Sequence, residues 1–102
     1  MSVKGALMIT AADNVATAIE NIDAGAEVPI RLGKEIRQVK AIERIPFGFK
    51  IAVTDIPQGA HVIKYGEAIG IASVDIRRGQ LVHIHNLEGA RGRGDLAKGD
   101  AQ

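Results

Sequence analysis

A short unit that occurs four times sets the strongest limit on what this 102-residue chain can fold into. Each copy has an isoleucine, a glycine three positions later and an aliphatic residue three positions after that; the copies span residues 22–28, 45–51, 56–62 and 76–82. Each copy predicts a tight turn, in which the glycine takes a positive φ that a β-carbon would oppose and the last residue begins a strand. Pro46 and Pro57 follow the isoleucine in two copies, where a fixed φ suits the first central position of a turn.

The remaining apolar segments predict a mainly β domain with one short helix near the N-terminus. Strands are expected over residues 3–10, 27–33, 49–54, 62–65, 68–72 and 81–85. Residues 35–43 carry apolar side chains three apart, which suits a helix, but the flanking Gly33 and Pro46 favour a strand. The whole pattern is that of short strands joined by similar turns.

Residues 10–21 are expected to form the helix. Apolar residues fall at helical spacing along this segment, and Thr10 or Asp13 offers a cap at its start. Asp13 and Asn14 are interpreted as capping residues rather than as site residues, because such side chains satisfy the free backbone amides where a helix begins.

Composition argues against several classes of function. The chain has 13 Lys+Arg against 12 Asp+Glu, so no global field attracts nucleic acid or an anionic membrane. Aromatic residues make up 3% of the chain, too few for a platform that stacks bases. There is no cysteine, which excludes disulfides and thiolate metal sites, and no segment approaches the length of a membrane span. We expect a cytoplasmic protein with no nucleic-acid or membrane partner.

One domain is expected over residues 1–87, followed by a flexible tail over residues 88–102. A chain of this size supports one modest core. Beyond Leu87 glycine becomes frequent and the apolar periodicity ends. Arg91 in the tail could clamp a carboxylate or sulfonate through its forked guanidinium, and the alternative is a tail that is simply solvated.

His83 and His85 are the best chemical lead in the chain. In an extended strand both imidazoles would project from one face while Val82 and Ile84 point into the core. Two imidazoles so placed can bind one divalent ion, with Asn86 or a ligand from elsewhere completing the shell. The alternative is a pair of surface or hydrogen-bonded structural histidines.

Three segments carry a resemblance to a known family. Residues 12–16 read ADNVA, residues 45–52 read IPFGFKIA and residues 62–86 read VIKYGEAIGIASVDIRRGQLVHIHN. They resemble the opening, middle and final motifs of the SAF-type domain of altronate and galactarate dehydratases. The same segments resemble the small subunit of sulfolactate sulfo-lyase. The chain has Phe49 where the family has a histidine. The resemblance implies a small SAF-type β-clip fold.

The resemblance also implies a lyase site. In such an enzyme the proton α to a carboxylate is removed and a β leaving group departs, with a metal or a lysine stabilising the enediolate. We assign three residues to catalysis: Lys50, His83 and His85. The two histidines are also assigned to a divalent ion such as iron, manganese or magnesium. Substrate binding is assigned to Lys64, Tyr65, Asn86 and Arg91.

Lys50, Lys64 and Tyr65 also have structural interpretations. Either lysine could instead lie at a strand edge, where its charge discourages aggregation, and Tyr65 could instead belong to a structural turn.

The sequence therefore predicts the small subunit of a sugar-acid dehydratase or related lyase, acting on altronate-like, galactarate-like or sulfolactate-like carboxylates. The large domain of such enzymes has no counterpart in 102 residues, so we expect a separate large subunit and no activity of the chain alone. The alternative is a stand-alone module that binds a carbohydrate or carboxylate, which Phe49 favours by removing a ligand or base. A homo-oligomer formed through β edges is a third expectation.

Overall fold

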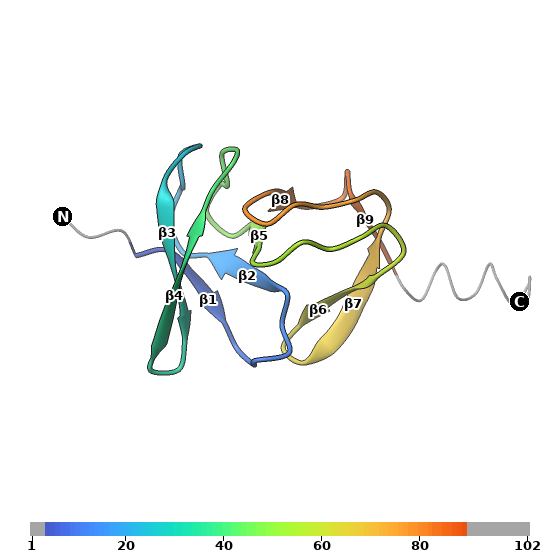
Figure 1. Ribbon diagram of the computed structural model, residues 1–102, viewed down its shortest axis with the longest axis horizontal. Coiled ribbons are helices and arrows are strands. Elements are labelled where there is room, and N and C mark those ends of the chain that lie inside the picture. The colour runs from blue at the N-terminus through green and yellow to red at the C-terminus, as the bar shows by residue number, and fades with distance from the viewer. Residues whose placement is uncertain (1–3, 90–102) are drawn as a thin grey trace, which may run out of the picture.

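The computed structural model describes residues 4–89, which form β-strands and contain no helix. The strands are β1 (Ala6–Met8), β2 (Val15–Ala18), β3 (Glu27–Leu32), β4 (Glu35–Lys40), β5 (Lys50–Ala52), β6 (His61–Lys64), β7 (Glu67–Ala72), β8 (Leu81–Val82) and β9 (Leu87–Glu88). They build a six-stranded sheet in the order β4-β3-β1-β2-β5-β8 and a three-stranded sheet in the order β6-β7-β9. Figure 1 shows the β3–β4 ribbon and the β6–β7 ribbon at opposite ends of the domain, with β2 and β5 between them. The expected mainly β class is confirmed, and this part of the chain holds no helix that could cross a membrane.

The predicted helix over residues 10–21 is wrong. Residues 10–13 form a turn in which the Asp13 amide donates to the Thr10 carbonyl at 3.1 Å, and β2 follows. β2 pairs antiparallel with both β1 and β5. Val15 and Ala16 are each 1% exposed, because apolar clusters cover both faces of this central strand. Burial on both faces removes the alternation that identifies a strand in a sequence.

Most of the other strands overlap the expected ranges: β1, β5 and β8 are shorter than predicted, whereas β6 and β7 begin one residue earlier than predicted. β9 lies where no strand was predicted. Residues 35–43, for which helix and strand were both considered, contain the strand β4 over Glu35–Lys40. Glu88, the first residue assigned to the tail, belongs to β9, which pairs with β7. Residues 90–102 of the predicted tail, including Arg91, lie outside the described residues. The β-clip topology implied by the resemblance stays a prediction.

The four repeated units form the predicted turns. Their glycines have φ between 87° and 90°, and each turn closes with a hydrogen bond of 2.9 to 3.1 Å across the glycine. The isoleucines pair in two antiparallel bridges, Ile22 with Ile45 and Ile56 with Ile76. Each isoleucine is at most 2% exposed. The four units therefore form two pairs of turns, and each pair has two buried isoleucines at its centre.

The two prolines of these turns sit one position earlier than predicted. The amides of Phe49 and Ala60 donate to the carbonyls of Pro46 and Pro57, at 3.0 and 2.9 Å. Each proline is therefore the first residue of its turn, and not the first central residue. A non-proline residue and the glycine are the two central residues, and the positive φ of the second is typical of a type II turn.

In three of the four units, the residue before the isoleucine caps the turn of the paired unit. The side-chain oxygens of Asn21, Asp55 and Asp75 each accept a hydrogen bond of 2.8 to 2.9 Å from the first central amide of the partner turn. In the remaining unit this position is Arg44, which offers no acceptor. The equivalent donor, the Ala24 amide, therefore lacks this cap.

Replacing Arg44 by aspartate is expected to raise the free energy of unfolding by about 1 kcal/mol, because the new carboxylate can accept the Ala24 amide. Urea denaturation at neutral pH measures the change. Arg44→Ala is the control, since it removes the positive charge without adding an acceptor. Equal stabilities of the alanine and aspartate variants would contradict the capping scheme.

The core has two parts on opposite faces of β2, β5 and β8. On one face Ala16 and Ile51 join a cluster that includes β1, β3 and β4 residues. On the other face Val15, Ala52 and Val82 join a smaller cluster with residues of β6 and β7. The smaller cluster holds the β6–β7 hairpin against the large sheet, and this junction is where the sequence motifs meet.

Candidate functional site

The last motif does not present its histidines from a strand. β8 ends at Val82, and the next four residues form a turn in which the Asn86 amide donates to the His83 carbonyl at 3.0 Å. The expectation that both imidazoles project from one strand face is therefore wrong. Val82 is buried as expected, but Ile84, expected in the core, is 82% exposed. His83 is half-buried and His85 is exposed.

Asn86 holds this turn together from inside. Its side chain is 0% exposed. Its Oδ1 accepts the His83 amide at 2.9 Å, and its Nδ2 donates to the Leu81 carbonyl at 2.8 Å. The Asn86 carbonyl also accepts the Ser73 amide at 3.0 Å. The substrate-binding role assigned to Asn86 stays a prediction, whereas the contacts present here are those of a residue that shapes the turn beneath His83.

Replacing Asn86 by alanine is expected to lower the free energy of unfolding by about 3 kcal/mol, because the His83 amide and Leu81 carbonyl would lose their partners in a buried setting. Urea denaturation measures the loss. Asn21→Ala is the matched control: it removes one hydrogen bond at an exposed cap, and we expect it to cost about 1 kcal/mol. Equal losses in the two variants would show that burial of Asn86 is not what matters.

Phe49 and His83 contact each other across β5 and β8. Lys50 pairs with Val82, so one further step of this antiparallel register places Phe49 beside His83. Their ring centroids are 4.4 Å apart with the planes tilted by 52°. This contact gives His83 an aromatic wall on one side and restricts where its ring can lie.

Lys50 and Lys64 are the lysines of the middle and last motifs. Lys50 is half-buried at the start of β5, and Lys64 is the last residue of β6. Burial lowers the pKa of the Lys50 ammonium, and the charge of Lys64 lowers it further. The two ammonium groups are therefore within electrostatic reach of each other. Such a pair of cations attracts an anion and makes the neutral amine of Lys50 more accessible.

Asp13 and Asn14 tie the first motif to the β6–β7 hairpin. Asn14 Oδ1 accepts the Ile63 amide at 2.7 Å, and Asn14 Nδ2 donates to the His61 carbonyl at 3.0 Å. Asp13 Oδ1 accepts the Gly66 amide at 2.8 Å. The capping chemistry expected of these two residues is present, but it serves a turn and a hairpin instead of a helix.

The ionised form of Asp13 is strongly favoured. Burial alone would raise the pKa of this carboxyl, but hydrogen bonds from the Gly66 amide, the Thr10 hydroxyl and the amides of Ile9 and Thr10 lower the pKa to about 2. Because the folded-state pKa is below the unfolded value, ionised Asp13 stabilises the fold above the unfolded pKa, and this stabilisation disappears as pH falls from about 4 toward 2.

Asp13→Asn is expected to lower stability at pH 7 by about 2 kcal/mol, because an amide nitrogen would face backbone donors in place of a charged acceptor. The variant is also expected to lose less stability than the parent between about pH 4 and pH 2, since it has no carboxyl to protonate at this position. Urea midpoints measured for both proteins across this range test the claim. Parallel pH profiles would contradict it.

All three motifs contribute to the smaller core cluster, through Val15, Ala52 and Val82. The first motif also reaches the hairpin through Asp13, whereas the contact of Phe49 with His83 lies on the other face of β5, toward the larger cluster. His85 is exposed at the far end of the same turn as His83. Sequence reasoning assigned the lysines and histidines individually, but it missed the role of Asp13 in anchoring the hairpin and of Phe49 in packing against His83.

Metal binding finds little support within this part of the chain. Residues 4–89 contain no group of three or more His, Cys, Asp or Glu side chains that could hold a metal ion. The ring of His83 packs against Phe49. An iron, manganese or magnesium ion at His83 and His85 would need further ligands from elsewhere, so it stays a prediction.

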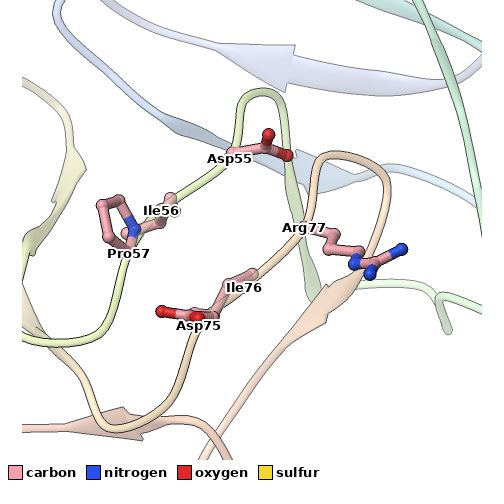
Figure 2. A pocket seen from close by; sticks show the side chains of 6 residues that line it. All are labelled: Asp55, Ile56, Pro57, Asp75, Ile76 and Arg77. Carbon is pink, nitrogen blue, oxygen red and sulfur yellow. The ribbon is translucent and has the colours of Figure 1, made fainter.

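Cavities of about 270 to 530 Å³ on the described surface are lined by residues other than those assigned to the site. Figure 2 shows one, of about 270 Å³, where Ile56 and Ile76 lie between Asp55 and Asp75 while the Arg77 side chain extends away. Both aspartates already accept turn amides. This cavity belongs to the paired turns rather than to the junction of the motifs.

The fold defines a small β domain built from two sheets and from turns that pair through buried isoleucines. More particularly, the chain belongs to the family of the altronate/galactarate dehydratase SAF domain, whose model matches residues 4–90. The family expected from the three motifs is thereby confirmed.

The relatives are enzymes of two related kinds. Altronate dehydratase from Escherichia coli (strain K12) is 42% identical over 80 residues, which is 78% of this chain but 15% of that enzyme. Galactarate dehydratase (L-threo-forming) from the same organism is 39% identical over 72 residues, 69% of this chain and 12% of that enzyme. (2R)-sulfolactate sulfo-lyase subunit alpha from Chromohalobacter salexigens is 33% identical over 75 residues, 72% of this chain and 80% of that subunit. The chain thus spans a small part of the dehydratases and most of the sulfo-lyase subunit.

Proposed function

We propose that this chain is the small subunit of a lyase that removes water, or a comparable β leaving group, from a hydroxylated acid of the altronate, galactarate or sulfolactate type. The observation that carries the proposal is the half-buried Lys50 at the start of β5, beside the core cluster to which all three family motifs contribute; burial and the charge of Lys64 lower the pKa of its ammonium group. A carboxylate or sulfonate is the ligand that two neighbouring ammonium groups attract. The substrates named for the relatives are all such anions.

The chemistry assigned to these residues is an elimination. Lys64 holds the substrate carboxylate, and the neutral amine of Lys50 takes the α proton, a task favoured by its lowered pKa. The electron pair left on the α carbon forms a double bond to the β carbon. The β hydroxyl departs as water with a proton from the imidazolium of His83 or of His85, which follows in the same turn. Tyr65 and Asn86, with Arg91 beyond the described residues, complete the predicted contacts to substrate.

A large partner subunit is part of the proposal. The matched region is 12% to 16% of the dehydratases, and a relative of comparable size is named as one subunit of its enzyme. The partner would supply the rest of the active site, including any further ligands for a metal ion. The cytoplasmic location and a possible homo-oligomer stay predictions.

A stand-alone module that binds a carbohydrate or carboxylate is the second candidate function. Phe49 favours it, because an aromatic ring takes the place of the family histidine and packs against His83. In this version the lysines bind the anion and no proton is moved. The two candidates differ in whether adding a large subunit produces turnover.

The test is an assay of the purified chain, with and without a co-expressed large subunit, on altronate, galactarate and sulfolactate. The lyase proposal predicts turnover only when both chains are present. Turnover by the isolated chain, or a large subunit whose rate is unaffected by this chain, would contradict it. Binding of one of these acids with no turnover under either condition would favour the module.

A further inference from the structure

The tip of the β6–β7 hairpin has an unusual backbone for the residue it carries. Among residues 4–89, Tyr65 is the one non-glycine residue with positive φ, at 57°, and Gly66 follows with φ 75°. Two central residues with positive φ make the hairpin turn that favours Asn-Gly or Gly-Gly. A tyrosine at the first position carries a steric cost that asparagine or glycine would avoid. Local backbone preference therefore does not explain this tyrosine, and strain of this kind often has a functional cause.

The aromatic ring of Tyr65 is used by its neighbour. Lys64 Nζ lies 4.9 Å from the centre of that ring, within the range of a cation–π contact. Glu67 stands directly opposite Lys64 in the β6–β7 register, yet no ion pair joins these two residues. The ammonium group thus lies over the ring although a carboxylate is available across the hairpin.

The turn itself is firmly anchored. Asp13 accepts the Gly66 amide at 2.8 Å, and a β-carbon added at Gly66 would lie 3.5 Å from Thr10 Cγ2. The hairpin tip is therefore fixed to the loop between β1 and β2. Because the backbone on both sides of Tyr65 is held, the strained turn sets the direction in which this side chain leaves the hairpin tip, and the ring in turn limits where Lys64 can reach.

We propose that Tyr65 is a positioning residue whose ring holds the Lys64 ammonium at the tip of the hairpin, so that this charge faces the anionic substrate. This inference rests on the proposed function for the identity of the anion, but not for the contact between Lys64 and Tyr65. Tyr65 acts through Lys64 and transfers no proton. A substitution that suits the turn better should therefore leave the fold intact while it weakens the site.

Tyr65→Asn and Tyr65→Phe are the matched variants. Asparagine suits the turn but has no ring, whereas phenylalanine keeps both the strain and a ring for the ammonium. In NMR spectra of the parent, the Lys64 ε-methylene protons should be shifted upfield by the ring. We expect this shift to persist in Tyr65→Phe and to disappear in Tyr65→Asn. Should Tyr65→Asn fold poorly, Tyr65→Gly suits the same backbone and repeats the measurement.

Titration of Lys50 provides a second readout that needs no substrate. Freed from the ring, Lys64 should move away, so the pKa of Lys50 should rise in Tyr65→Asn and stay unchanged in Tyr65→Phe. Lys64→Gln is the reference, because deleting the charge should also raise the pKa of Lys50. Galactarate, added as the probe, should bind about two- to fivefold more weakly to Tyr65→Asn than to the parent.

The outcomes separate the two proposals. An unchanged Lys64 proton shift and an unchanged Lys50 pKa in Tyr65→Asn would overturn the positioning role, whatever galactarate does. If both NMR readouts change as expected but galactarate binds neither protein, the positioning role stands and the choice of substrate is wrong. Equal weakening of galactarate binding in the asparagine and phenylalanine variants would point to the hydroxyl, and would contradict a role for the ring.

Discussion

Gly79→Ala is expected to lower the free energy of unfolding by about 3 to 4 kcal/mol, the largest stability change among single substitutions at the repeated turns. Gly79 has φ +90°, and an added β-carbon would overlap the backbone carbonyl oxygen of Lys40. The oxygen cannot easily withdraw, because the Gly79 carbonyl accepts the Ile42 amide at 3.0 Å and the Gly79 amide donates to Ala52 at 2.8 Å. Urea denaturation measures the loss.

Gly59→Ala is the matched control. Gly59 occupies the same place in its own turn with φ +88°, but an added β-carbon would meet nothing within 4 Å. We expect this variant to lose about 1 kcal/mol, the cost of a β-carbon at positive φ alone. The difference between the two alanine variants isolates the crowding against Lys40. Equal losses would contradict the packing described for Gly79.

Lys50→Gln is expected to lower the turnover of the assembled two-chain enzyme by about a hundredfold or more, because it removes both a substrate charge partner and the proposed base. The fold should not suffer, since burial and the charge of Lys64 both disfavour the Lys50 ammonium. Initial rates with saturating large subunit, together with thermal unfolding of the small chain, give the two measurements.

Lys40→Gln provides the comparison for that experiment. Lys40 is an exposed lysine at the end of β4, and it has no part in the proposed site. Its replacement should leave turnover within about twofold of the parent, as is usual for surface changes away from such a site. If Lys50→Gln were as active as Lys40→Gln, the catalytic assignment of Lys50 would be wrong.

Local rules predicted the turns well, because a glycine with positive φ and a buried isoleucine three residues earlier depend mainly on nearby sequence. The helix prediction failed at β2 for a physical reason. Val15 and Ala16 are both buried, since this strand has a core cluster on each face, and its residues therefore show no alternation. Asp13 signalled a cap correctly, but the structure that it caps lies far along the chain at Gly66.

The site could be predicted in its parts but not in its assembly. The family motifs pointed to Lys50, Lys64 and His83, which come from three segments that the structure joins only through pairings between distant strands, such as that of Lys50 with Val82. The extended His-x-His arrangement failed because Asn86 turns the chain back after Val82. The alternation of apolar and polar residues does not predict that the amide of Asn86 is buried. The contact of Phe49 with His83 likewise depends on the register of β5 with β8, which single-sequence patterns do not fix.

The most direct measurement is an NMR titration of the ¹⁵N-labelled chain with galactarate, with amide and lysine side-chain shifts followed residue by residue. The account predicts that the shifts centre on Lys50, Lys64 and His83, and that they vanish in a Lys50→Gln, Lys64→Gln double variant. Shifts centred instead on the cavity between Asp55 and Asp75, and unchanged in the double variant, would contradict the claim that the meeting of the three motifs is the functional site.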